Sequence, residues 1–143
     1  MGPGERTVRA LVDTSVLYAA ARPSEHAHQS ATQALARYSG NLVVPETVLS
    51  ELMSLVRVRA GVHAQRAFWD AFMKSGIQVI SADSELLEAA RRIDSTYEDA
   101  GFGFVDCVLL AMCEREQCSR LLTLDRTLSL YRPTFAKVLE IIP

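Results

Sequence analysis

The feature that most constrains the fold is a regular alternation of short apolar stretches with longer helical ones. Short aliphatic and β-branched runs occur at 7–12 (TVRALV), 42–44 (LVV), 77–80 (IQVI), 120–125 (RLLTLD) and 137–142 (KVLEII). Their length and composition are typical of buried strands. Strands that alternate with helices favour a parallel sheet covered on both faces. The sequence therefore predicts an α/β fold, a three-layer α/β/α sandwich with a central, mostly parallel sheet of four to five strands.

Helical patterns fill the segments between these strands. The predicted helices are 16–21, 25–38, 46–59, 63–74, 84–96 and 104–116. Ser24 and Asp83 stand where N-caps are expected, and Pro45 stands where a helix tolerates a first-turn proline. Gly61 and Gly76 follow helix ends, as glycine commonly does. The stretches 98–103 and 126–131 are expected to be turns.

Composition limits the class of protein. A chain of 143 residues with 49% hydrophobic residues can bury a core, and we expect one domain over residues 1–143. The 15 basic and 17 acidic residues give a net charge of −2, so a phosphate-bearing partner must be bound locally. No apolar run approaches the roughly 18 residues of a membrane span. The first residues lack the pattern of a signal peptide, and we expect a soluble cytoplasmic protein with no membrane partner.

The three cysteines give no sign of a metal or redox site. Cys107, Cys113 and Cys118 match none of the common metal-binding or redox spacings. We expect them to be packed thiols.

Two acidic residues follow predicted strands. Asp13 comes directly after the first strand, and Asp125 ends the fourth. In open parallel sheets, ligands bind beyond the carboxyl ends of the strands. The alternative is that each carboxylate caps the helix or turn that follows it.

Two further acidic residues lie within apolar helical segments. Glu51 shares one side of its predicted helix with Val48 and Leu55, and Asp106 lies in the first turn of the segment FVDCVLLAM. Glu51 could instead extend its carboxylate into solvent from the edge of that side. Asp106 could be a first-turn residue that interacts favourably with the helix dipole.

Taken together, the four carboxylates point to a cation site. Two strand ends and two helix faces can converge on one pocket, where several carboxylates repel each other unless a cation is shared. Mg²⁺ and Mn²⁺ prefer such hard oxygen ligands. We therefore expect Asp13 to be a metal ligand at the edge of the sheet.

Four motifs carry a family resemblance. In order and spacing, LVDTSVL, PETVLSEL, FVDCVLLA and LLTLDRTL resemble the acidic motifs of PIN-domain ribonucleases of the VapC type, the toxins of type II toxin–antitoxin systems. The resemblance implies that Asp13, Glu51, Asp106 and Asp125 are the catalytic, metal-binding residues. Among them we expect Asp13, Asp106 and Glu51 to be direct ligands and Asp125 to act through water. It also implies that the hydroxyls of Ser15 and Thr123 orient these ligands through hydrogen bonds.

The resemblance further implies a function and partners. These are Mg²⁺- or Mn²⁺-dependent cleavage of single-stranded or structured RNA that leaves a 5′-phosphate and a 3′-hydroxyl, homodimerisation, and inhibition by a proteinaceous antitoxin. Candidate phosphate contacts lie near the proposed active-site elements, with solvated side chains as the alternative. They are Arg22, Arg57, Arg59 and Arg126.

Nearby residues leave some alternatives open. Glu98 and Asp99 precede the third acidic motif and could substitute for a ligand or add one, whereas Glu46 is read as a first-turn helix residue. An apolar cluster on the helix 63–74 favours core packing, although partial exposure would suit an antitoxin groove. Its members are Phe68, Trp69, Phe72 and Met73.

Two other function classes remain as alternatives. A non-catalytic, RNA- or partner-binding PIN-like module would share the fold without turnover. A receiver-like phosphoacceptor domain would share the sheet and the acidic pocket, but it calls for adjacent early acids and a lysine after a late strand. Here the lysines are Lys74 and Lys137, and Lys137 precedes the last predicted strand.

Overall fold

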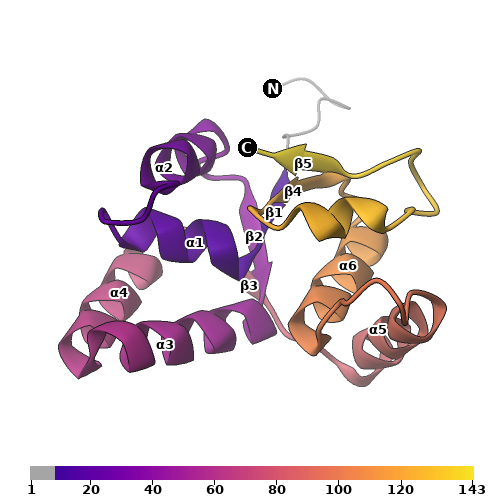
Figure 1. Cartoon of the computed structure of the whole chain (residues 1–143), viewed down its shortest axis with the longest axis horizontal. Coiled ribbons are helices and arrows are strands. Elements are labelled where there is room, and N and C mark those ends of the chain that lie inside the picture. Colours follow the sequence, from indigo (N-terminus) through magenta and orange to yellow (C-terminus); the bar gives the residue numbers. More distant parts are fainter. Residues whose placement is uncertain (1–8) are drawn as a thin grey trace.

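The computed structural model describes residues 9–143 and has a five-stranded parallel sheet at its centre (Figure 1). The strand order is β3-β2-β1-β4-β5, and each neighbouring pair is parallel. The strands are β1 (Ala10–Val12), β2 (Leu42–Pro45), β3 (Gln78–Ile80), β4 (Arg120–Leu122) and β5 (Glu140–Ile142). The predicted parallel sheet is confirmed.

Helices cover both faces of this sheet. Helices α1 to α4 lie on one side and α5 and α6 on the other (Figure 1). They are α1 (Thr14–Ala21), α2 (His28–Arg37), α3 (Glu46–Ala60), α4 (Val62–Lys74), α5 (Ser84–Thr96) and α6 (Phe104–Glu116). A 3₁₀ helix, η1 (Arg126–Leu130), joins β4 to the segment before β5. The predicted α/β/α sandwich is confirmed.

The core extends over both faces of the sheet, and β1 and α6 are among its most deeply buried elements. All three residues of β1 are at most 1% exposed, and α6 is buried without interruption from Cys107 to Cys113. A helix that is apolar on all sides is stable only when protein surrounds it, as α6 is here. The core therefore fixes the orientation of the helix that carries Asp106.

Several predicted boundaries are wrong by a few residues. The first helix begins at Thr14 rather than 16, because Asp13 caps it. The second begins at His28, so Ser24 is not its cap, and its N-cap Ala27 offers no side-chain hydrogen bond.

The predicted strands are longer than the observed ones. β4 ends at Leu122, so Thr123 and Leu124 separate it from Asp125. β5 contains only the last three residues of the predicted run 137–142. Residue 9 precedes β1, and residues 7 and 8 of the first predicted strand lie outside the described part of the chain.

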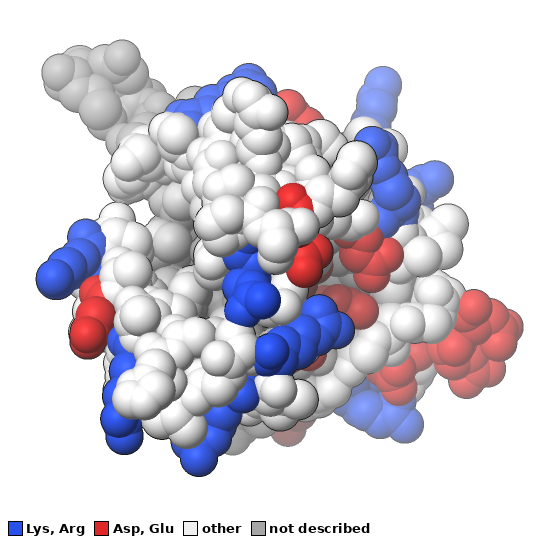
Figure 2. Space-filling model, turned by 60° about the vertical axis from the view of Figure 1, so that its left-hand side comes forward, with Lys and Arg blue, Asp and Glu red and all other residues white. Residues whose placement is uncertain are grey.

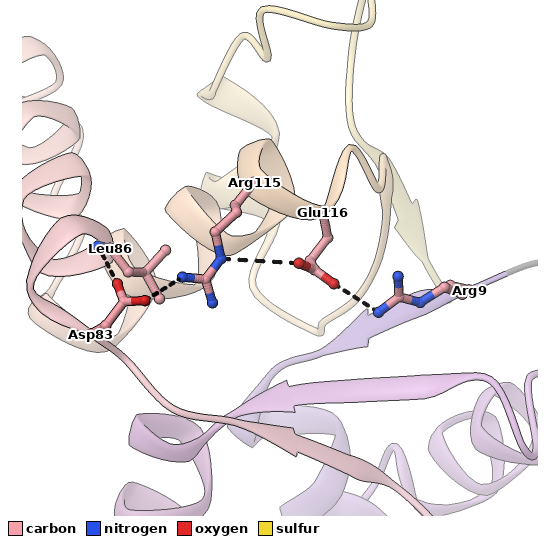
Figure 3. A network of polar contacts seen from close by, with 5 residues as sticks. All are labelled: Arg9, Asp83, Leu86, Arg115 and Glu116. Carbon is pink, nitrogen blue, oxygen red and sulfur yellow. Dashed lines mark hydrogen bonds and ion pairs between the residues drawn. The ribbon is translucent and has the colours of Figure 1, made fainter.

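A chain of polar contacts joins the start of the sheet to α5 and α6 (Figure 3). The predicted N-cap Asp83 accepts a hydrogen bond of 2.9 Å from the backbone N–H of Leu86. Its other oxygen pairs with Arg115 at 3.0 Å, and Glu116 pairs with Arg9 at 2.9 Å. These partly exposed pairs hold the end of α6 against the start of α5 and the residue before β1, each with a small gain in stability.

The cysteines are buried and free, as predicted. No helix between residues 9 and 143 is long and apolar enough to cross a membrane. On α4, Phe72 is buried and Phe68 is half-buried, whereas Trp69 and Met73 are 56% and 70% exposed. The predicted apolar cluster is thus divided between core and surface.

Replacing Leu110 with alanine should lower the free energy of unfolding by about 2–5 kcal/mol, because its fully buried side chain would leave a cavity in the core. Leu130→Ala is the matched control, since Leu130 is 52% exposed. Urea denaturation followed by circular dichroism measures both. Equal losses in the two variants would contradict the position of α6 in the core.

Candidate functional site

The candidate site lies at the carboxyl edge of the sheet, where the neighbouring strands β1 and β4 end. From β1 the chain proceeds through β2 to β3 on one side, and then returns to place β4 on the other side of β1. Such a reversal of strand order is the usual position of a ligand site in an open parallel sheet. Asp13 directly follows β1, and its backbone N–H donates to the carbonyl of Leu122 at 2.8 Å.

Asp13 is buried, with 6% of its surface exposed, and its carboxylate accepts three hydrogen bonds. Oδ1 accepts from the backbone N–H of Thr14 at 2.8 Å, which makes Asp13 the N-cap of α1. Oδ2 accepts from the hydroxyls of Thr123 at 2.7 Å and Ser15 at 3.1 Å. Burial raises the pKa of Asp13, these hydrogen bonds lower it, and the charge of Glu51 raises it further.

The hydroxyls of Ser15 and Thr123 join the ends of the two strands. Each donates to Asp13, and each also accepts a backbone N–H from the segment after β4. Ser15 accepts from Leu124 at 3.0 Å, and Thr123 accepts from Asp125 at 3.0 Å. The two residues therefore fix the Asp13 carboxylate against the segment that carries Asp125.

Asp106 lies half-buried in the first turn of α6, where it accepts a hydrogen bond of 3.2 Å from the backbone N–H of Gly103. Burial is the main cause that raises the pKa of Asp106 to about 6. The Gly103 contact opposes that rise, and the charges of Asp13, Asp125 and Glu51 add to it. The structure thus brings the carboxylates of Asp13, Asp125 and Glu51 within electrostatic range of Asp106.

Glu51 and Asp125 reach this region from the surface. Glu51 is exposed, so the prediction that it lies on the buried side of its helix is wrong; Val48 occupies that side and Leu55 is half-buried. The carboxylate of Glu51 extends from the edge of the apolar side, which was the alternative. Asp125 caps η1, because its Oδ1 accepts from the backbone N–H and the hydroxyl of Thr127 at 3.0 and 2.7 Å.

The four carboxylates have no positively charged ion-pair partner in the described part of the chain. Over residues 9–143, none of them takes part in an ion pair. Neither do any three acidic, histidine or cysteine side chains in that range form a ready-made metal cluster. Their donor atoms are all carboxylate oxygens, which suits Mg²⁺ or Mn²⁺, and their mutual repulsion is what a cation would relieve. The residues fit such an ion by the chemistry of their donor atoms and by their charge.

The structure places the four arginines proposed for phosphate contact at the end of α1 and on α3 and η1. Arg22 ends α1 and is half-buried, Arg126 directly follows Asp125, and Arg57 and Arg59 lie in the last turn of α3. The guanidinium of Arg59 lies 5.2 Å from the centre of the Tyr18 ring. In Figure 2 the side of the molecule that carries α1 to α4 comes forward, and acidic side chains lie beside basic ones there. None of the four arginines forms an ion pair with a residue in the described chain.

Other acids near the motifs lie outside this group. Glu98 and Asp99 are exposed, and neither is among the charges that raise the pKa of Asp106. Glu46 is exposed in the first turn of α3, as predicted.

A cavity of about 490 Å³ opens next to the candidate site, between α3, the start of α5 and the start of α6. Glu51 forms part of its wall, and so does Phe104, the residue two positions before Asp106. Phe104 was predicted only as the start of an apolar helix, yet it is 63% exposed. An aromatic residue in the first turn beside a candidate ligand was the signal available for it in the sequence.

Known proteins resemble this chain in sequence and in fold. The chain is 29% identical over 134 residues to Ribonuclease VapC26 of Mycobacterium tuberculosis. This alignment covers 93% of this chain and 99% of that protein. The crystal structure of VapC20 from M. tuberculosis, a toxin that cleaves the sarcin-ricin loop, superposes with a TM-score of 0.80. That match has 20% sequence identity and covers 90% of this chain and 98% of VapC20.

A further structure has the same fold, and a family match runs through most of the sequence. VapBC2 from Rickettsia felis, bound to a DNA fragment from its promoter, has a TM-score of 0.66 at 16% identity, covering 82% of this chain and 89% of that one. Residues 10–132 match the family described as the PIN domain, a range that begins with β1 and includes all four candidate carboxylates. The chain therefore belongs to the PIN domain family.

Proposed function

We propose that the protein is a Mg²⁺- or Mn²⁺-dependent endoribonuclease that acts as the toxin of a toxin–antitoxin pair. One observation carries the proposal: carboxylates from other elements gather around Asp106, where burial above all, and then the charges of Asp13, Asp125 and Glu51, raise its pKa to about 6. A divalent cation would relieve this crowding, which no ion pair with a described residue relieves. RNA as substrate is supported by likeness to a protein named Ribonuclease VapC26 and to a toxin that cleaves the sarcin-ricin loop.

In this proposal Asp13, Asp106 and Glu51 hold the ion directly, and Asp125 acts through water. When bound, such an ion supplies Lewis-acid polarisation of the scissile phosphate and lowers the pKa of the attacking water. Ser15 and Thr123 keep the Asp13 carboxylate oriented, because each donates a hydrogen bond to its Oδ2. The expected products carry a 5′-phosphate and a 3′-hydroxyl.

Arginines bring the RNA to an otherwise acidic site. Arg126 is adjacent in sequence to Asp125 and is exposed, so it is the first candidate for a phosphate contact. Arg22, Arg57 and Arg59 are candidates for contacts farther along the strand. Their guanidinium groups can each donate two parallel hydrogen bonds to a phosphate.

The protein partner in this proposal is an antitoxin. Likeness to VapBC2, which is bound to a fragment of its promoter DNA, and to a toxin–antitoxin complex from Klebsiella pneumoniae supports it. Trp69 and Met73 on α4 offer exposed apolar surface of the kind that a partner covers. Homodimerisation and a cytoplasmic location are part of the same proposal and stay predictions.

Asp13→Asn and Asp106→Asn should each lower the rate of Mn²⁺-dependent RNA cleavage at least about 100-fold, because each removes a charged ligand from the site. Cleavage of a single-stranded RNA pool, with sequencing of the new 5′ ends, measures this loss. Asp70→Asn on α4 is the control, since Asp70 is exposed and lies on another element.

Two results would contradict the proposal. If both site variants cleave as fast as the unmodified protein, the carboxylates are not the active site. If the unmodified protein binds RNA but leaves it intact with either metal, the chain is the non-catalytic module instead.

Millimolar Mn²⁺ should raise the melting temperature by several degrees, because an ion that binds only the folded state stabilises it by about 2.7 kcal/mol at one hundred times its dissociation constant. Thermal unfolding monitored by circular dichroism measures the shift. The Asp13→Asn/Asp106→Asn double variant should lose most of it. An equal shift in that double variant would place the ion elsewhere.

Without metal, Asp106→Asn should stabilise the protein at pH 7.5 but not near pH 4. The folded-state pKa of Asp106 is about 6 and its usual value is 3.8, so its ionisation destabilises the fold progressively as pH rises between them. Allowing for solvent screening, we expect a gain on the order of 1 kcal/mol at pH 7.5. Urea denaturation in EDTA tests this, with Asp99→Asn as control. A loss of stability at pH 7.5 would contradict the raised pKa of Asp106 in the folded protein.

A further inference from the structure

Phe104 presents an aromatic ring to solvent directly beside the candidate active site. It is the first residue of α6 and is 63% exposed, whereas Phe102, two residues earlier, is 8% exposed and packs in the core. Two positions further on stands Asp106. An aromatic ring left out of the core at such a place is available to a ligand.

The cavity that Phe104 borders has an unusual combination of groups. Its apolar wall includes Ala82 and Leu87, and hydroxyl side chains such as Ser50 line the side formed by α3. Its charged lining residues are Glu46 and Glu51, with no lysine or arginine among the described residues that form it. These carboxylates repel a phosphate group, so an uncharged part of an RNA chain suits the cavity better than its backbone does.

A nucleobase matches this chemistry. It is flat, uncharged and able to stack on an aromatic ring, and its N–H groups can donate hydrogen bonds to carboxylates. A cavity of about 490 Å³ holds one such ring system with room for water. Glu51 borders the cavity and is also one of the four carboxylates, so a base in the cavity lies next to the phosphate position.

We infer that this cavity binds one unstacked nucleobase of the RNA substrate, with Phe104 as the stacking platform and Glu46 as an acceptor for the base edge. The inference rests on the proposed function and adds to it a base-binding subsite next to the scissile phosphate. Because the site takes a base out of its stack, the substrate is a single-stranded or looped segment.

Glu46 gives the subsite a base preference. Its carboxylate is exposed in the cavity wall and forms no ion pair with any residue from 9 to 143. A carboxylate accepts hydrogen bonds from the exocyclic amino groups of guanine, adenine and cytosine, whereas uracil has only its ring N3–H to donate. The subsite therefore favours a base with an amino group over uracil.

The test is an abasic scan of a short RNA that the unmodified protein cleaves. Removing each base near the cleaved bond in turn should lower kcat/KM by about 10- to 100-fold at one position, the one that enters the cavity. In Phe104→Ala the same base removal should cost little, because its stacking partner is already gone. Phe104→Tyr should behave as the unmodified protein, and Phe104→Leu should resemble Phe104→Ala.

The control is Val138→Ala, since Val138 is 56% exposed and lies outside the cavity lining. Base removal should cost this variant as much as it costs the unmodified protein. If base removal at every position lowers the kcat/KM of Phe104→Ala as much as that of the unmodified protein, the subsite is wrong while the ribonuclease proposal stands. If the unmodified protein cleaves no RNA, the proposed function fails, and the subsite that rests on it falls with it.

Base preference is tested with Glu46→Gln and its matched control Glu85→Gln, which changes the first-turn glutamate of α5. At the position found by the abasic scan, the unmodified protein should cleave RNA with an amino-bearing base more than about 10-fold faster than RNA with uracil. Glu46→Gln should reduce that ratio, and Glu85→Gln should leave it unchanged. An unchanged ratio in Glu46→Gln would remove Glu46 from the subsite.

Discussion

Mutual repulsion among four carboxylates is the constraint around which the carboxyl edge of the sheet is organised. Asp13 is buried, and three hydrogen-bond donors partly compensate for its desolvation. Asp106 has one backbone donor and the positive end of the α6 dipole. Asp125 uses one oxygen to cap η1, and Glu51 extends into solvent. These contacts make the crowding tolerable without neutralising it, which leaves a demand for positive charge.

Much of the fold could be predicted because local signals and burial agree. The helix 104–116 was predicted with its observed bounds, since Gly103 precedes it and its apolar run is long. The α2 start was mispredicted because Ser24 is a favourable cap by residue type, but the chain turns until His28. The short strands were overestimated because strand ends depend on pairing across the sheet, which adjacent residues do not reveal.

For the site, sequence could say which residues are out of place but not how they are oriented. The hydroxyls of Ser15 and Thr123 were placed by family resemblance, and the structure shows both donating to Asp13. Glu51 was expected on a buried side because helical spacing gives only an angle around the axis. Whether that angle faces the core depends on how α3 packs. The exposure of Phe104 likewise depends on packing between α3, α5 and α6, which the sequence pattern does not reveal.

The three-residue length of β1 limits how the chain can change. Side chains alternate between the two faces of a strand, so one inserted residue would turn the Asp13 carboxylate to the opposite face and move it by about 3.3 Å. Its contacts with Ser15 and Thr123 would then be lost together. Insertions and deletions are thus compatible with an exposed surface segment such as 23–26, whereas the number of residues from Ala10 to Thr14 cannot change.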